Sequence, residues 1–223
     1  MRISESDGKP QSRSSYYLQM RALALEKRRL YGVETPKLNL TLMRRIYKAE
    51  GITIDRRTLS GNNIRASYFC DDGDYSVLLN KELPREPKLF SLVHELKHHY
   101  VDREIIQGGL IRCGDYNRNE FIEKAAEVFA AEFIYPEDEM RALAASLGVN
   151  ASTCTKEKVV EFKRACRACI SYTFVVKRFE WFGFCPRDAY SKVQFQKLEE
   201  DIYGLPIYKQ EWFKKRRATA RKK

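Results

Sequence analysis

The sequence predicts an α+β fold in which a small antiparallel sheet packs on two helices, with a helical C-terminal extension. Three short segments, 52–59, 64–69 and 75–80, run apolar or alternate between apolar and polar residues, which is typical of strands. The segments 88–104 and 120–135 instead place apolar residues at helical spacing and contain neither Gly nor Pro. After Pro136 the pattern is helical, which accounts for the extension.

The other elements follow from the same patterns. Residues 1–14 are rich in Ser, Gly, Lys and Pro, so we expect them to be disordered. The run Asp71-Asp72-Gly73-Asp74 predicts the hairpin turn between the last two strands, and 107–119 predicts a loop that shapes a cleft. The remaining expected helices are 15–31, 40–50, 137–147, 156–167, 171–182 and 190–203. The expected parts are a polar N-terminus with a basic helix (1–39), a core (40–140), a helical C-terminal region (141–205) and a basic tail (206–223).

The segment His94-Glu95-Leu96-Lys97-His98 is an HExxH motif inside the first of the two long helices. Residues four apart on a helix share a face, so the two imidazoles can bind one zinc ion while Glu95 acts as general base on a water. The other interpretation is a pair of histidines buried in a core, with their ring nitrogens hydrogen-bonded to other protein groups. All three histidines of the chain lie in 94–99, and His99 points about 100° away from His98, so no further histidine completes the site.

A third metal ligand must therefore be a carboxylate or a cysteine. The best candidates are Glu123 and Glu127, which lie four residues apart on one face of the helix 120–135. In this interpretation Glu123 binds the metal, and Glu127 supports a ligating histidine through its second ring nitrogen. Taken alone, the two glutamates are equally typical of a solvated helix surface.

Three blocks of sequence resemble the ImmA/IrrE family of zinc metallopeptidases, a gluzincin-like family. Its members pair a HELGH-type helix with a later Glu-x-x-Ala-Asn/Asp-x-Phe-Ala-x-x-Leu-Leu-x-Pro helix. The matching blocks are Phe90–His98, Glu123–Pro136 and, downstream, Cys169–Gly183, so the resemblance covers roughly residues 40 to 185. By this resemblance His94, His98 and Glu123 are the zinc ligands and Glu95 is the catalytic acid/base.

Three residues depart from the family pattern without removing a ligand. Lys97 stands where the family usually has Gly, which a helix tolerates. Glu127 stands where the family usually has Asn or Asp, so its contact with a histidine would be made by a longer side chain. Ala125 replaces a common acidic residue, which leaves Glu123 as the suitable glutamate in that half-turn. The oxyanion of the reaction needs a further donor, for which Tyr68, Tyr100 and Tyr135 are candidates.

The resemblance implies hydrolysis of a peptide bond in a specific regulatory protein, such as a helix-turn-helix repressor, in stress response or transcription regulation. An alternative is a non-cleaving, zinc-containing regulatory module that antagonises a DNA-binding partner. A second alternative is a DNA-binding regulator in which 156–183 forms a helix-turn-helix. The apolar residues of 171–182 are typical of a core helix, which argues against it.

Composition predicts a cytoplasmic protein with one sizeable core and no membrane partner. At 223 residues and 43% hydrophobic content, the chain has no apolar run near the ~18 residues of a membrane span and no signal peptide. The six scattered cysteines are expected to be reduced thiols, and Cys166-Arg-Ala-Cys169 is a weak candidate for a second zinc site. Of the net charge of +11, most lies in the segment 214–223, a candidate for non-specific contact with nucleic acid.

Overall fold

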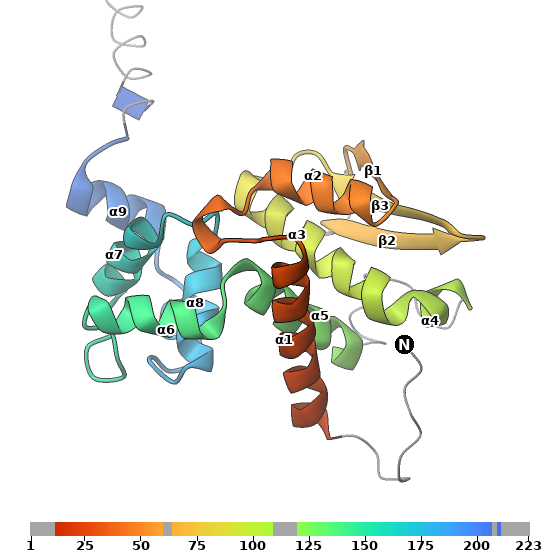
Figure 1. The fold of residues 1–223 in the computed structure, drawn as a ribbon. Coiled ribbons are helices and arrows are strands. Elements are labelled where there is room, and N and C mark those ends of the chain that lie inside the picture. Colours follow the sequence, from red (N-terminus) through yellow and green to blue (C-terminus); the bar gives the residue numbers. More distant parts are fainter. Residues whose placement is uncertain (1–11, 60–63, 109–119, 207–208, 211–223) are drawn as a thin grey trace, which may run out of the picture. The chain divides into compact units, whose positions relative to one another are not determined.

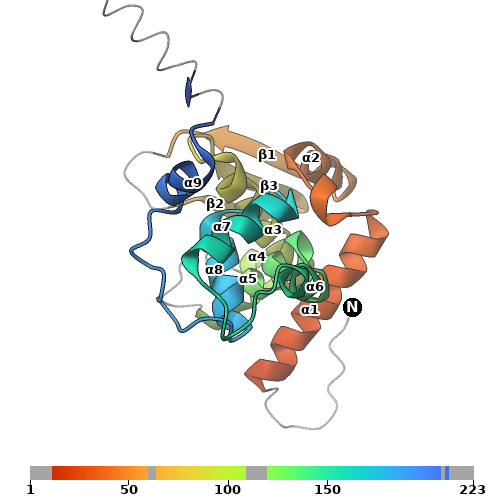
Figure 2. The same ribbon diagram turned by 90° about the vertical axis from the view of Figure 1, so that its left-hand side faces the viewer.

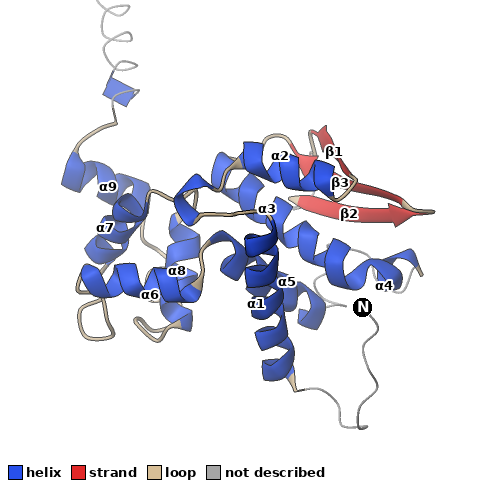
Figure 3. Ribbon diagram, in the orientation of Figure 1, coloured by secondary structure: helices blue, strands red, loops and turns tan. Residues whose placement is uncertain are grey.

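The computed structural model describes residues 12–59, 64–108, 120–206 and 209–210. The helices and strands are labelled in Figure 1 and coloured by type in Figure 3. In chain order they are α1 (Arg13–Leu30), the 3₁₀ turn η1 (Thr35–Lys37), α2 (Leu40–Ala49), β1 (Ile52–Arg57), β2 (Ala66–Asp71), β3 (Asp74–Asn80), α3 (Arg85–Lys97), the π-helical turn η2 (His98–Asp102), α4 (Arg103–Gln107), α5 (Glu120–Ile134), α6 (Glu137–Ser146), α7 (Lys156–Cys166), α8 (Tyr172–Trp181) and α9 (Phe195–Tyr203).

The chain forms two compact units, which we describe separately. Unit 1 comprises residues 1–141 and 168–171, and unit 2 comprises 142–167 and 172–223. The first therefore contains the sheet and the helices α1 to α5, while the second contains α7, α8 and α9. The predicted α+β class is confirmed, and so is the helical C-terminal part.

The sheet of unit 1 has three strands in the order β1-β3-β2. The β2–β3 pair is an antiparallel hairpin that turns at Asp72 and Gly73, both with positive φ, as the sequence predicts. The β1–β3 pair is parallel, so the expectation of an antiparallel sheet is wrong for this pair. The reason is that β3 lies between the two strands that precede it, and β1 and β2 therefore do not pair.

Helices of unit 1 bury the apolar side of this sheet. Alternate residues Val77 and Leu79 of β3 are buried, because successive side chains of a strand point to opposite faces. The helix α3 packs against β2 and β3, and α2 packs against β1 and α3. The hydroxyl of buried Tyr47 in α2 donates a hydrogen bond to the carbonyl of Leu92 in α3, 2.7 Å away, which fixes the two helices at one relative height.

A second layer of unit 1 is formed where α5 packs between α1 and α3. Figure 2 shows this part of the fold turned by 90°, with α1 seen along its length. Several small residues of α5 are fully buried, namely Ala125, Ala126 and Ala130, and their size lets neighbouring helices approach closely. This packing, together with the sheet, forms the core beneath the HExxH helix.

Local signals in the sequence set the helix boundaries. Asn39 begins α2 with its side-chain oxygen accepting from the backbone N–H groups of Thr41 and Leu42, and Thr155 caps α7 in the same way. The helices expected at 15–31, 40–50, 137–147, 156–167 and 171–182 agree with the observed ones to within about two residues. The last helix begins at Phe195 rather than at 190. Residues 1–11, 109–119 and 211–223 lie outside the described residues, and with them most of the expected disordered N-terminus, the expected loop and the expected basic tail.

Unit 2 is built around α7, which packs against α8 and α9. Val159, Val160 and Phe162 of α7 and Val175 and Phe179 of α8 are fully buried. The rings of Phe162 and Phe179 meet edge to face, with 5.1 Å between their centroids. The apolar face of α8 is therefore used for packing, which disfavours a base-reading role for this helix. None of the described helices is long and apolar enough to cross a membrane.

A buried arginine, Arg28, connects α1 to the C-terminal end of α5. Its guanidinium donates to the carbonyl of Phe133 at 2.5 Å and to the hydroxyl of Thr35 at 3.0 Å, and it approaches Glu139 at 3.5 Å. Its neighbour Arg29 is exposed. Burial without these acceptors would be costly for a charged group, so the contacts make Arg28 a strong connection between the helices.

We predict that Arg28→Met destabilises unit 1 by about 2–3 kcal/mol, because it leaves a buried carbonyl without its donor. The matched variant Arg29→Met should change stability by less than about 0.5 kcal/mol. Urea unfolding followed by circular dichroism measures both. Equal midpoints for the two variants would contradict the role assigned to Arg28.

Candidate metal centre

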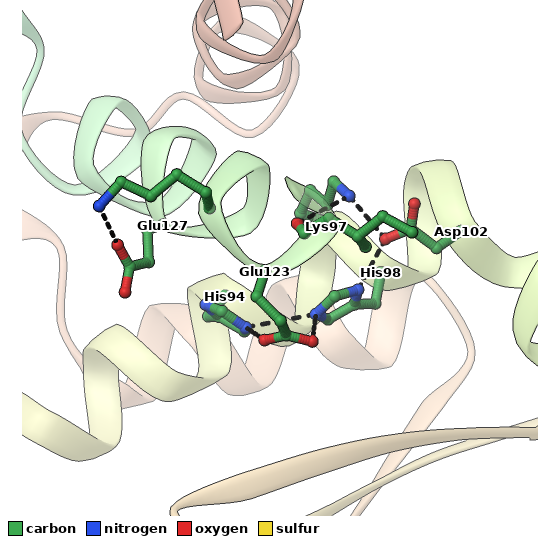
Figure 4. A network of polar contacts seen from close by, with 8 residues as sticks. His94, Lys97, His98, Asp102, Glu123 and Glu127 are labelled. Atoms are coloured by element: carbon green, nitrogen blue, oxygen red, sulfur yellow. Dashed lines mark hydrogen bonds and ion pairs between the residues drawn. The ribbon is translucent and has the colours of Figure 1, made fainter. Parts of the chain in front are cut away.

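Three predicted ligand residues come together between α3 and α5. His94 lies in α3, His98 begins the π-helical turn η2, and Glu123 lies in the first turns of α5. One donor atom from each lies within 4.8 Å of the others, and this is the one such group found among the described residues. Figure 4 shows Glu123 reaching from α5 to the two imidazoles, which face it from the neighbouring helix. The described part of the chain groups neither Cys166 nor Cys169 in this way.

The distances within this group match the donor set of a tetrahedral zinc ion. The Nε2 atoms of His94 and His98 are 3.2 Å apart, and Glu123 Oε2 is 3.0 Å from His94 Nε2. Glu123 Oε1 is 3.6 Å from His98 Nε2. Ligand bonds of 2.0–2.1 Å at tetrahedral angles separate neighbouring donors by about 3.3 Å. Catalytic zinc sites have three protein ligands, such as two imidazoles and a carboxylate, and keep the fourth position for water.

The negative charge around His94 favours a cation at this place. Burial lowers the pKa of His94, but the hydrogen bond to Glu123 and the charges of Glu95, Glu123 and Glu127 outweigh it, so the pKa is raised. Glu95 is 3% exposed and its carboxylate is near enough to act on His94. The negative charges that favour a proton on His94 also favour a metal ion bound to the same nitrogen.

The residue that orients His98 is Asp102, which sequence analysis missed. Its Oδ2 lies 2.6 Å from Nδ1 of His98. A carboxylate accepts, so Nδ1 carries the hydrogen and Nε2 keeps its lone pair for a metal. Asp102 is four residues after His98, at the end of η2, so the i, i+4 spacing was the signal that could have identified it. The π-helical turn belongs to a class of irregularity that is frequent at functional sites.

Glu127 has a different environment from the one expected. Its Oε2 accepts from the ammonium of Lys124, 2.8 Å away. Its charge acts on His94 through space and contributes to the raised pKa of that residue. The role predicted for Glu127 as a support of a ligating histidine stays a prediction, whereas Asp102 makes such a contact to His98.

The other candidates of the HExxH region belong to a separate polar cluster. His99 is buried, with Nδ1 3.0 Å from the hydroxyl of Tyr68 and Nε2 3.7 Å from Glu50. The hydroxyl of Tyr100 donates to the same Glu50 at 2.7 Å. Burial raises the pKa values of Tyr68 and Tyr100, so both hydroxyls stay protonated. These contacts disfavour Tyr68 and Tyr100 as donors to an oxyanion, and Tyr135 is buried too.

We predict that Asp102→Asn weakens zinc binding about 10- to 100-fold, the usual effect of losing such a contact. Glu127→Gln should weaken it less, because the Glu127 side chain bonds to Lys124. Competition with a chromophoric chelator gives both affinities. A larger loss for Glu127→Gln than for Asp102→Asn would reverse the assignment and support the original prediction for Glu127.

Comparison with known sequences identifies the family of this chain. No curated protein sequence matched it. A family model described as Peptidase_M78, IrrE N-terminal-like domain, matches residues 48–164, which is more than half of the chain. The match begins in α2 and ends in α7, so it contains the sheet, both HExxH histidines and Glu123. The resemblance inferred from the sequence is thus confirmed over residues 48–164, and the chain belongs to the IrrE N-terminal-like peptidase family. The third block, Cys169–Gly183, lies beyond this match.

Proposed function

We propose that this protein is a zinc-dependent endopeptidase that hydrolyses a peptide bond in a specific regulatory protein. The observation that carries the proposal is the cluster of His94, His98 and Glu123 beside buried Glu95, in a member of a peptidase family. Two imidazoles and one carboxylate suit zinc, and they also accept manganese, iron or cobalt. Bound zinc would supply a Lewis acid that polarises the scissile carbonyl and acidifies water.

Glu95 is the proton carrier in this proposal. It follows His94 directly, so its side chain leaves α3 about 100° around the helix axis from that ligand, and its charge acts on His94. From there the carboxylate would accept the proton of the attacking water and deliver it to the leaving amine. Asp102 orients His98, and Glu123 reaches His94 from α5, so these three residues would hold the metal while Glu95 moves the proton.

For the substrate we propose a helix-turn-helix repressor, cut at one exposed site. The family resemblance supports this substrate class, and the link between fold and substrate is an analogy. The segment 214–223 would contribute non-specific attraction to DNA-bound targets. The competing hypothesis is a regulatory module that binds zinc and antagonises a DNA-binding partner without cleavage. Glu95 separates the two, because only the peptidase requires its carboxylate.

We predict about one zinc per chain in the wild-type protein and its loss in His98→Ala and Glu123→Ala. Each substitution removes one of three ligands. The matched control is Glu120→Ala, which removes an exposed glutamate from the same helix and should retain zinc. Elemental analysis of protein purified without added metal gives the content. A wild-type protein that stays zinc-free after reconstitution would contradict the proposal.

We predict that Glu95→Gln retains zinc but lowers peptide hydrolysis at least about 100-fold, because the amide cannot accept the proton. Cells producing the wild-type or the variant protein are compared for new protein N-termini by mass spectrometry. A small set of N-termini that depends on Glu95 and includes a repressor supports the proposal. Many unrelated cuts would contradict the single-target substrate, and zinc binding without any cut would favour the non-cleaving module.

A further inference from the structure

Lys97, the fourth residue of the HExxH motif, is fully buried between the two helices that carry the metal ligands. Its exposed fraction is 0%, and it lies among the largest completely buried side chains of the described residues. Lysine is almost never fully buried unless it is paired, because removing an ammonium group from water is costly. The buried ammonium group of Lys97 therefore needs hydrogen-bond acceptors close to it.

The ammonium group of Lys97 binds groups that belong to both ligand-bearing helices. Its Nζ donates to Oδ2 of Asp102 at 2.7 Å. It also donates to the backbone carbonyl of Ile122 at 3.3 Å. Ile122 directly precedes the ligand Glu123 in α5, and Asp102 ends the turn that begins at the ligand His98. One cation thus connects the backbone beside one ligand to the carboxylate that orients another.

Lys97 and His98 converge on the same oxygen atom. Oδ2 of Asp102 accepts from Lys97 at 2.7 Å and lies 2.6 Å from Nδ1 of His98, as Figure 4 shows. The two donors fix the carboxylate from different directions, so it has one favourable orientation. Because that carboxylate in turn fixes the imidazole of His98, the orientation of Nε2 toward Glu123 depends on Lys97.

We propose that Lys97 is a positioning residue for the metal centre, acting through Asp102 on His98 and through Ile122 on Glu123. The proposal rests on the metal site of the proposed function. Lys97 is not one of the grouped ligand residues, so its contribution is to hold two ligands at binding distance before the metal arrives. Pre-organisation of this kind raises affinity because less ordering remains to be done on binding.

If only the charge of Lys97 mattered, its removal would change the zinc affinity in the opposite direction. A cation near the site repels a metal ion, so removing Lys97 would strengthen binding if charge alone mattered. The positive charge is neutralised by Asp102 at 2.7 Å, which leaves little net field from the pair. The positioning effect should therefore dominate, and the sign of the change in affinity distinguishes the two explanations.

The test is zinc affinity and the Co²⁺ absorption spectrum of full-length Lys97→Met. Zinc affinity should fall about 10- to 100-fold, as for loss of other groups that orient a ligand. The visible bands of bound Co²⁺ should weaken or shift, since they report coordination geometry. The matched control is Lys88→Met, on the same helix, where the ammonium donates to the exposed carbonyl of Lys81 rather than to a group beside a ligand. It should behave as wild type in both measurements.

The pair of variants Lys97→Met and Asp102→Asn tests the route of the effect. If Lys97 acts mainly through Asp102, the double variant should bind zinc almost as well as Asp102→Asn alone. If Lys97→Met does not fold, Lys97→Gln replaces it, because its amide keeps a donor without the charge, and an affinity between wild type and Asp102→Asn is then expected. Unchanged or tighter zinc binding with a wild-type Co²⁺ spectrum would overturn the proposal. A wild-type protein that binds no zinc would instead overturn the proposed function.

Discussion

The close packing of α5 on α3 is the constraint on which the rest of unit 1 depends. The two histidines come from one helix, but Glu123 is 25 residues beyond His98 in the chain, and only this packing brings it within 3.6 Å of that imidazole. The buried alanines of α5 permit the approach, and the sheet supports α3 from its other side. A larger residue at Ala126 would separate the helices and so act on the ligand set as well as on the core. In this protein, stability and site geometry are set by the same contacts.

The parts of the site that are local in sequence were predictable, and those that depend on packing were not. The HExxH spacing identifies His94 and His98 because a helix alone brings them together. Helical spacing placed Glu123 and Glu127 on one face of 120–135, and the family pattern then supported Glu123 as the ligand. The same i, i+4 spacing could have identified Asp102, but Glu127 was favoured because it lies one turn after Glu123 on the same face of the helix 120–135. Burial of Lys97 could not be predicted, because an HExxH helix seen alone gives this residue no neighbour from α5.

In the sheet, too, only the features that are local in sequence could be predicted. The hairpin of β2 and β3 follows from the Asp72-Gly73 turn, whose positive φ values only a few residue types adopt. The place of β1 has no such local signal, because its partner is β3 rather than the next strand in the chain. The pattern of each segment predicts that a strand exists and which face is buried, whereas the pairing order depends on contacts between segments that are distant in the sequence. The error in strand direction therefore leaves the position of α3 and its histidines unchanged.

Charge inside unit 1 is costly, and this cost bears on the choice between the two functions. Glu95, Lys97, Asp102 and Glu123 are all at most 4% exposed. Well-packed apolar residues in their place would be expected to stabilise the fold or leave it unchanged. A module that used zinc only to hold its shape would need the ligands and the groups that orient them. It would not need a buried carboxylate at Glu95, whose negative charge acts on His94 without being among the grouped ligands. Retaining that charge is understandable if it moves a proton, so the energetic argument favours the peptidase.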